Sequence, residues 1–246
     1  MTHTPSALVT GATRGIGRAI ADRLAADGWA LTLVARNADA LADTADALRA
    51  AGSPDVLVCP ADLSDADSAA APIAAHGEKY GSLDALILNA GMGLRAPFAD
   101  MPLRRFDKLF AINVRAPFVM MQAATPLLTT AAEARPDKGA KVVALASSTG
   151  VYAEEGYAAY GASKAALISM LETYTIEHSG AGVMATTLSP GYVDTDMTDW
   201  VDEQTRATML SADDLAVMTT ALLDLSSRAF VKNITLTRAG TPGYGA

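Results

Sequence analysis

The chain has 246 residues, half of them apolar, which is enough to bury the core of one large α/β domain or of two small ones. Its formal net charge of −8 argues against nucleic acid or an anionic membrane as a partner, because both require a basic footprint. No apolar run approaches the roughly eighteen residues of a membrane span, and Met1 to Ser6 is short and polar, so we expect a cytoplasmic protein.

The first predicted element is a short buried strand at Ser6–Thr10, which leads into a turn punctuated by Gly11, Gly15 and Gly17. An apolar-periodic helix follows and ends near Gly28. Glycines permit a sharp turn and a close approach of the backbone to a pyrophosphate, and the N-terminus of the helix offers free N–H groups to the anion. Strand, glycine turn and helix in this order are typical of a dinucleotide site.

The second predicted strand, Ala30–Ala35, is followed by Arg36 and Asn37. An NAD-binding version would place an Asp or Glu about twenty residues after the glycine turn for the ribose hydroxyls. Here Ala35 is neutral, whereas Arg36 is a planar cation suited to a 2′-phosphate, and Arg14 in the glycine turn could hold the same group. The sequence therefore predicts a preference for NADP(H); a solvated charge at the strand end is the alternative for Arg36.

The third and fourth predicted strands each end in a polar turn. The third, Asp55–Cys59, follows a helix at 38–51 and precedes Asp62-Leu63. Open parallel sheets bind ligands beyond the carboxyl ends of their strands, so Asp62 is predicted either to contact an adenine or to cap a helix at about 65–80. The fourth strand, Leu83–Leu88, ends in Asn89-Ala90-Gly91, which is ordinary turn chemistry when taken alone.

A long helix is predicted from Pro102 to about Leu128, and a polar surface connection at Thr129–Gly139 follows it. Asn113 lies inside the apolar part of this helix, where a polar side chain needs a partner. Pro117, one turn later, lacks a backbone N–H and is expected to disturb the helical hydrogen bonds there.

The fifth predicted strand, Lys141–Ala146, runs into Ser147, and a helix at about Tyr157–Ser179 comes next. Tyr160 and Lys164 are four residues apart in this helix, so they lie one turn above each other on the same face. An ammonium within a few ångströms lowers the pKa of a phenol, from about 10 by roughly one to three units. The pair is predicted to serve general acid-base catalysis, although the same spacing also occurs on many solvated helices.

The sixth predicted strand, Val183–Leu188, precedes the turn Pro190-Gly191-Tyr192-Val193-Asp194-Thr195. The segment at about 191–211 is polar with scattered apolar residues and is long enough to form a lid with a short helix. A last helix at Asp213–Leu225 and a final strand at Asn233–Thr237 complete the pattern.

Strands and helices alternate throughout, without a linker or an internal repeat. This pattern predicts one doubly wound Rossmann-type α/β domain, with a mainly parallel seven-stranded sheet and helices on both faces. Within residues 1–246 we expect a cofactor half at about 1–140 and a catalytic and substrate half at about 141–246. The single Cys59 excludes an internal disulfide, and His3, His76 and His178 are isolated in sequence, so no metal site is expected.

In combination, seven motifs resemble those of the short-chain dehydrogenase/reductase family in order and approximate spacing. They are Thr10-Gly11-x-x-x-Gly15-x-Gly17, Asp62-Leu63, Asn89-Ala90-Gly91, Asn113, Ser147 at the strand end, Tyr160-x-x-x-Lys164 and Pro190-Gly191-x-x-x-Thr195. The resemblance covers about Ala7 to Thr195, and the joint match is far more specific than any one motif. The final strand departs from the family, because it lacks the Asp-Gly-Gly ending that many members carry.

The resemblance implies an NADP(H)-dependent enzyme that interconverts a carbonyl compound and a secondary alcohol by hydride transfer. Tyr160 would pass a proton to the carbonyl oxygen, Lys164 would lower the tyrosine pKa and bind the nicotinamide ribose, and Asn113 would hold a water of a proton relay. Ser147 aligns with the catalytic serine, and Ser148 is the other candidate. The implied cofactor contacts are Gly11, Thr13, Arg14, Gly15, Ile16, Gly17, Arg36, Asn37, Asp62, Leu63, Asn89, Ala90, Gly91, Tyr160, Lys164, Pro190, Gly191, Val193 and Thr195.

The predicted substrate is a medium-sized carbonyl compound or secondary alcohol, because the side chains expected around the pocket are mostly apolar and soft. They are Met92, Ser148, Tyr152, Tyr157, Tyr192, Met197 and Trp200. For Met197 and Trp200, packing of the lid on the body of the protein is an equally good interpretation.

Two other functions stay open on the residues alone. A 3-oxoacyl-[acyl-carrier-protein] reductase would need a basic surface for its acidic carrier; the end of the catalytic helix is acidic, but Arg95, Arg104, Arg105 and Lys108 form another candidate surface. A catalytically silent NADP-sensing regulator would be expected to have lost a catalytic tyrosine, lysine or serine, and none is lost here.

The helices at about 106–128 and 157–179 carry apolar residues on more than one face, so a second surface must bury them. In the family that the sequence resembles, these helices commonly pair between subunits. We therefore expect a homodimer or homotetramer with two-fold interfaces.

Overall fold

The computed structural model describes residues 3–65 and 68–241. Within them the strands are β1 (Ser6–Thr10), β2 (Ala30–Ala35), β3 (Val56–Pro60), β4 (Ala85–Leu88), β5 (Ala140–Leu145), β6 (Val183–Pro190) and β7 (Asn233–Leu236). They form one sheet in the order β3-β2-β1-β4-β5-β6-β7, and each neighbouring pair is parallel. The predicted doubly wound sheet is confirmed, and it is parallel throughout.

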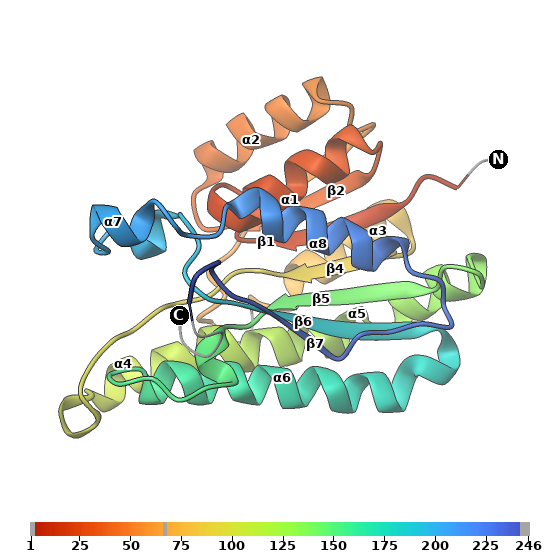
Figure 1. Ribbon diagram of the computed structural model, residues 1–246. Helices are drawn as coiled ribbons and strands as arrows, with labels where there is room; N and C mark the ends of the chain where they lie inside the picture. The colour runs from red at the N-terminus through yellow and green to blue at the C-terminus, as the bar shows by residue number, and fades with distance from the viewer. Residues whose placement is uncertain (1–2, 66–67, 242–246) are drawn as a thin grey trace.

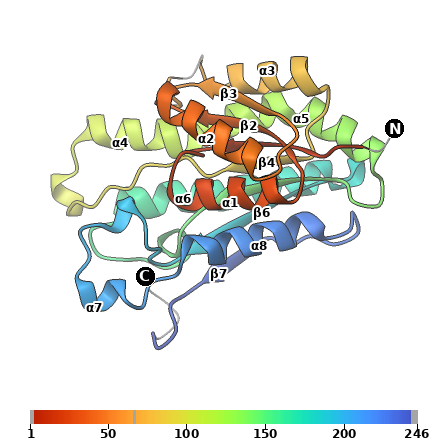
Figure 2. The ribbon, with the colours of Figure 1, turned by 90° about the horizontal axis from the view of Figure 1, so that it is seen from above.

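Helices cover both faces of this sheet. They are α1 (Gly15–Ala26), α2 (Ala38–Ala50), α3 (Ala71–Tyr80), α4 (Leu103–Phe110), α5 (Ala116–Ala134), α6 (Ala158–His178), α7 (Glu203–Arg206) and α8 (Ala212–Asp224). Helices α1, α2 and α8 lie on one face, and α3, α5 and α6 lie on the other (Figures 1 and 2). Because both faces are covered, strands such as β1 and β5 are buried along their whole length and read as continuous apolar runs.

Two apolar cores result, one on each face of the sheet. Leu24 and Leu215 pack in the core beneath α1 and α8, whereas Met120 and Leu171 pack in the core beneath α5 and α6. All four side chains are fully buried, and each contributes on the order of 1.5–3 kcal/mol to folding. The strand order reverses between β1 and β4, and open sheets bind ligands beyond the carboxyl ends of the strands at such a point.

The helix predicted at about 65–80 begins later than expected, at Ala71. Upstream of it, the Ser68 hydroxyl donates to the carbonyl oxygens of Asp62 and Asp65, at 2.6 and 3.1 Å. Short polar side chains that bond to the nearby backbone compete with helix formation, and Pro72 suits a first helical turn. Asp62 therefore does not cap this helix, and that prediction was wrong.

The long helix predicted from Pro102 to Leu128 is divided. Helix α4 is followed by a π-helical turn at Ala111–Arg115, and α5 then continues to Ala134, so its end was placed too early. Pro117 cannot donate to the carbonyl four residues before it, which favours a wider turn at Asn113. The last turns of α5 persist because Ala131 and Ala132 are buried in the core.

Two further findings concern the described residues as a whole. No helix among them combines the length and the apolar composition that a membrane crossing requires. Nor do three His, Cys, Asp or Glu side chains gather at any point in this part of the chain where they could hold a metal ion. Cys59 is half-buried, and burial raises the pKa of its thiol.

Candidate active site

The turns that follow β1 and β4 are tied to each other. The backbone N–H groups of Asn89 and Ala90 both donate to Thr10 Oγ1 at 2.9 Å, and Asn89 Nδ2 donates to the carbonyl oxygens of Thr10 and Gly11 at 3.0 and 3.2 Å. Gly11 has φ +66°, and a Cβ on Gly17 would overlap the Gly11 carbonyl and the Asn89 amide. The result is a braced loop that admits only glycine at its closest approaches, which is what a pyrophosphate cradle requires.

Thr10 is a positioning residue that the sequence analysis missed. It is buried, and its hydroxyl accepts two hydrogen bonds while it donates a third, to the Ile87 carbonyl oxygen at 3.2 Å. The signal was present, because a threonine at the end of a buried strand carries a hydroxyl that needs partners. Two of these partners come from the turn after β4, so the hydroxyl fixes the two turns relative to each other.

The end of β2 lies beside the glycine loop and is cationic. Arg36 is exposed just after the strand, and Asn37 caps α2 by accepting a backbone N–H at 3.1 Å. Asp62 accepts hydrogen bonds from Ser64, which hold the pKa of its carboxyl below the ordinary value, and Arg36 and Lys108 act in the same direction more weakly. The structure thus places Arg36 and Asp62 in one neighbourhood, at the carboxyl ends of β2 and β3.

Tyr160 and Lys164 lie one turn apart in α6, at the carboxyl end of β5. Lys164 is buried; its Nζ donates to the Leu145 carbonyl oxygen at 2.7 Å and lies 5.7 Å from the centre of the Tyr160 ring. Burial lowers the pKa of Lys164 to about 8. Burial also raises the pKa of Tyr160 to about 12, against a smaller lowering by a hydrogen bond with Ser147.

The predicted lowering of the Tyr160 pKa by Lys164 was therefore wrong for this arrangement. Loss of solvation disfavours the phenolate, and the ammonium makes its hydrogen bond to Leu145 rather than to the phenol. At neutral pH the phenol keeps its proton. Tyr160 is set up as a proton donor, and as a base only at higher pH.

The two candidate serines differ in their partners. Ser147 lies close enough to Tyr160 to lower the pKa of its phenol, and its Oγ accepts from the hydroxyl and the backbone N–H of Thr149, at 3.0 and 3.3 Å. Ser148 is only 1% exposed, and among the described residues its Oγ has no hydrogen-bond partner. The structure links Ser147 to the tyrosine and gives no such link for Ser148.

Asn113 joins the loop after β4 to the catalytic helix. Its Oδ1 accepts from the Met92 N–H at 2.8 Å, and its Nδ2 donates to the Met92 carbonyl at 3.0 Å and to Ser163 Oγ at 3.1 Å. Ser163 in turn donates to the Tyr160 carbonyl oxygen at 2.7 Å. Asn113 is buried, and the π-helical turn aims its side chain at this junction, so it positions the segment that carries Tyr160.

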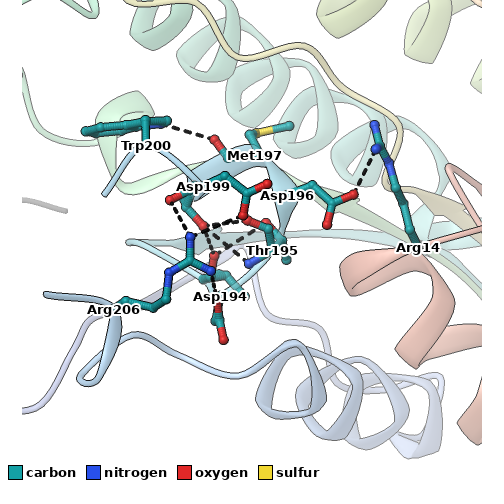
Figure 3. A network of polar contacts seen from close by, with 10 residues as sticks. Arg14, Asp194, Thr195, Asp196, Met197, Asp199, Trp200 and Arg206 are labelled. Carbon is teal, nitrogen blue, oxygen red and sulfur yellow. Dashed lines mark hydrogen bonds and ion pairs between the residues drawn. The ribbon is translucent and has the colours of Figure 1, made fainter. Parts of the chain in front are cut away.

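The lid, residues 191–211, is a closed loop with its own internal bonds. Its two ends are paired, because the Leu210 N–H donates to the Tyr192 carbonyl at 3.0 Å and the Asp194 N–H donates to the Leu210 carbonyl at 2.9 Å. Inside the loop, Arg206 forms ion pairs with Asp194 at 3.0 Å and Asp199 at 3.1 Å (Figure 3). These bonds tie the two ends and the interior of the lid to one another.

Aromatic side chains link the lid to the start of α6. The rings of Tyr192 and Trp200 meet edge to face with centres 5.7 Å apart, and the Arg95 guanidinium lies 5.8 Å from the centres of both the Trp200 and Tyr157 rings. Tyr192 donates from its hydroxyl to Glu154 Oε1 at 3.2 Å. Glu154 lies in the loop after β5 that was expected to line the pocket, whereas Arg95 was expected only on a basic surface and is a polar residue of this wall that the prediction did not include.

The other predicted pocket residues are less uniform in their placement. Met197 packs against Gly93, where an added Cβ would lie 3.4 Å from its sulfur, so the lid contacts the loop after β4. Tyr152 lines a hollow of about 320 Å³ beside the start of α6, together with Tyr157 and Ala162; neither Tyr160 nor Lys164 is among the described residues that line it.

The remaining predicted cofactor contacts surround the glycine loop. Thr195 meets Gly15, where an added Cβ would lie 3.2 Å from the threonine methyl group, and Gly191 donates to the Leu236 carbonyl at 2.8 Å. Val193 is buried, and Ile16 packs against the same core from the start of α1. The turn after β6 therefore contacts the glycine loop directly, through Thr195 and Gly15.

Comparison with known proteins gives consistent matches over most of the chain. A family model for short chain dehydrogenases matches residues 5–206. The chain is 33% identical to 2-(R)-hydroxypropyl-CoM dehydrogenase of Xanthobacter autotrophicus over 198 residues, which are 79% of this chain and 76% of that protein. It is 36% identical to the rhamnolipid-biosynthesis 3-oxoacyl-[acyl-carrier-protein] reductase of Pseudomonas aeruginosa over 213 residues, 86% of this chain and 80% of that protein.

A solved structure extends the similarity to the whole fold. The alcohol dehydrogenase of Thermococcus sibiricus, complexed with 5-hydroxy-NADP, superposes with a TM-score of 0.86 at 27% identity and covers 97% of both chains. This agreement includes the region beyond residue 206, where the lid ends and α8 and β7 follow.

Proposed function

The chain belongs to the short-chain dehydrogenase family, and on that premise we propose that it is an NADP(H)-dependent oxidoreductase that interconverts a carbonyl compound and a secondary alcohol. The proposal rests on one observation above all. Tyr160, the buried Lys164 and Ser147 lie together at the carboxyl end of β5: Lys164 Nζ is 5.7 Å from the centre of the Tyr160 ring, and Ser147 is close enough to the phenol to lower its pKa. A silent regulator would have no use for this convergence.

The cofactor is NADP(H), which supplies the hydride of the reaction. The residues fit it in two respects: Gly11 and Gly17 allow the tightly packed turn that presents the backbone at the N-terminus of α1 to a pyrophosphate, and Arg14 and Arg36 offer guanidinium groups to a 2′-phosphate. We place the protein in the cytoplasm, a reducing compartment in which the free thiol of Cys59 stays reduced.

Each side chain at the end of β5 has a distinct task. Tyr160 donates its proton to the carbonyl oxygen during reduction, and Ser147 donates a hydrogen bond to the same oxygen. Lys164 uses one N–H on the Leu145 carbonyl and keeps two donors for the nicotinamide ribose. Asn113 fixes Met92 relative to the helical turn that carries Tyr160, through its hydrogen bonds to Met92 and Ser163. It would also hold the water through which Lys164 exchanges protons with solvent.

The test is to measure NADPH and NADH binding by fluorescence, followed by turnover with ketones, 3-oxoesters and diketones. Tyr160→Phe should lose about two to four powers of ten in kcat, because it removes the proton donor while leaving the cofactor site intact. Tyr174→Phe is the matched control, since this tyrosine lies in the same helix but its hydroxyl bonds to Thr125 at 3.0 Å, so its loss should change kcat little. NADPH binding without turnover on any substrate would favour the sensor and contradict the proposal.

A second candidate is reduction of a 3-oxoacyl group on an acyl-carrier protein, and one surface favours it. Phe98 and Leu103 are 86% and 77% exposed beside Arg104 and Arg105 at the start of α4. Basic residues around exposed apolar side chains suit an acidic protein partner. Arg104→Glu with Arg105→Glu should lower kcat/KM for a carrier-bound substrate but not for the free ketone; an equal effect on both would exclude this candidate.

We further propose that the chain forms a homodimer or homotetramer through α5 and α6. Phe118 and Ile176 are exposed on these helices, and an apolar hollow of about 550 Å³ is lined by residues such as Phe110, Val114 and Met170. A second copy would bury this surface with two-fold symmetry. Sedimentation of a monomer at micromolar concentration would contradict the proposal.

A further inference from the structure

One ion pair connects the glycine loop to the lid, across 182 positions of sequence. Arg14 Nη1 donates to Asp196 Oδ2 at 2.8 Å (Figure 3). Arg14 immediately precedes α1, and Asp196 follows Thr195, which touches Gly15, so the pair lies where the turn after β6 meets the glycine loop. The carboxylate and the guanidinium thus meet where the lid begins.

This pair differs from the ion pairs inside the lid. Arg206 binds Asp194 and Asp199, so it stabilises the lid as a unit without attaching it to anything else. Arg14 and Asp196 are 71% and 61% exposed and share one hydrogen bond. Exposed pairs of this kind contribute little free energy and exchange partners readily.

We propose that Asp196 is a determinant of cofactor selectivity, because its carboxylate competes with the 2′-phosphate of NADP(H) for the Arg14 guanidinium. The inference rests on the proposed use of NADP(H). A phosphate dianion is a stronger partner for a guanidinium than an exposed carboxylate is, so it draws Arg14 from the lid. NADH carries no 2′-phosphate, so it does not compete with Asp196 for the Arg14 guanidinium.

The competition has a reciprocal consequence for the lid. If the 2′-phosphate weakens the Arg14–Asp196 contact, then the contact weakens phosphate binding by the same factor. Asp196→Asn removes the competitor and nearly preserves the shape of the side chain. NADPH should then bind about two- to five-fold more tightly, which is the range that an exposed pair can supply, and the NADPH-to-NADH affinity ratio should rise by the same factor.

The first experiment measures that ratio in the full-length protein by fluorescence titration. Asp199→Asn is the matched control, because it removes an equal charge from the same lid but from a carboxylate that pairs with Arg206. Any general effect of charge on the diphosphate appears for both cofactors and cancels in the ratio. In an Arg14→Ala background, Asp196→Asn should leave the ratio unchanged, which closes a double-mutant cycle.

The second experiment reports on the lid without any turnover. Trp200 lies in the lid and Trp29 precedes β2, so Trp29→Phe leaves a lid-specific fluorophore. Adenosine 2′,5′-bisphosphate carries the phosphate without the nicotinamide. It should increase acrylamide quenching of Trp200, whereas AMP should not, and Asp196→Asn should already show the higher quenching without a ligand.

The outcomes separate this inference from the proposed function. A wild-type protein that does not prefer NADPH would remove the cofactor argument itself. An NADPH-selective protein in which Asp196→Asn leaves the ratio unchanged, or weakens both cofactors, would overturn the competition and make Asp196 a lid contact only.

Discussion

His76 in α3 makes the stability of this protein depend on pH. The imidazole is fully buried; Nδ1 accepts from the Thr32 hydroxyl at 2.8 Å, and Nε2 donates to the Ser82 carbonyl at 3.0 Å, with Ser6 Oγ at 3.3 Å. Both nitrogens are satisfied with the ring neutral. Burial lowers the pKa of His76 from 6.5 to about 4, although the Ser82 carbonyl and the Asp84 charge oppose the shift.

The sign follows from proton linkage. The unfolded chain takes up a proton at His76 below about pH 6.5, whereas the folded chain does so only near pH 4, so stability falls as the pH is lowered through this interval. The two values give a loss of about 2 kcal/mol between pH 8 and pH 5, and about 3 kcal/mol by pH 4. A loss of this size is a large share of the stability of an ordinary domain.

Urea unfolding of wild type and His76→Gln at pH 8 and pH 5 measures this contribution. The variant should be the less stable at pH 8, and the gap should narrow by about 2 kcal/mol at pH 5, because only wild type has a buried imidazole to charge. Thr32→Val is the control, because it removes a hydrogen-bond partner of His76 but leaves the imidazole in place. This variant should be about 1 kcal/mol less stable than wild type, and between pH 8 and pH 5 it should lose as much stability as wild type does. Equal pH dependence in wild type and His76→Gln would refute the reasoning.

Three more predictions concern the candidate site. Ser147→Ala should lower kcat for ketone reduction by about a hundredfold, because Ser147 lies beside Tyr160. Ser148→Ala should leave kcat and the stability in urea close to wild type, because the Ser148 hydroxyl has no hydrogen-bond partner among the described residues. If steady-state assays give the reverse order, Ser148 is the catalytic serine. The rate of ketone reduction should decline as the pH rises through about 8, where Lys164 loses its proton. A pH–rate profile that stays flat well above pH 8 would show that the charge of Lys164 is not needed for reduction. Gly17→Ala should abolish NADPH binding measured by titration, because the added Cβ overlaps the Asn89 amide. Gly180→Ala is the control and should bind NADPH normally, because Gly180 has open space around it. Retained binding in Gly17→Ala would show that the glycine loop rearranges to accept a side chain.

Local patterns were sufficient for much of the fold. Ser6–Thr10 and Ala30–Ala35 are found with the bounds predicted, because each is an apolar run between turn residues and both lie in the covered interior of the sheet. The sheet's parallel order follows from alternation of strands and helices, which requires crossover connections. These features depend on short stretches of chain, so the sequence of each stretch is enough to predict them.

Features that depend on residues distant in sequence could not be predicted from local patterns. The side chains of Asp62 and Ser68 make hydrogen bonds to nearby backbone groups that favour turns over helix after β3, and nothing in a helical pattern ranks these competing hydrogen bonds. The Tyr160 pKa depends on how deeply α6 is buried, which no spacing encodes. Likewise, Arg14 meets a carboxylate 182 positions away only when the lid has folded against the glycine loop.

The π-helical turn at Ala111–Arg115 makes the length of this segment critical. A π turn holds one residue more than the α-helical turn that it replaces, so α4 and α5 form one continuous rod with a single surplus residue. Deleting one residue here would restore the α-helical repeat, leave α4 and α5 nearly in their present mutual orientation, and remove the wide turn that carries Asn113. Substitutions in the turn alter chemistry one side chain at a time, but a deletion would swing Asn113 off Met92 and Ser163 at once. The segment should therefore be among the least tolerant of length variation in a helix that otherwise looks ordinary.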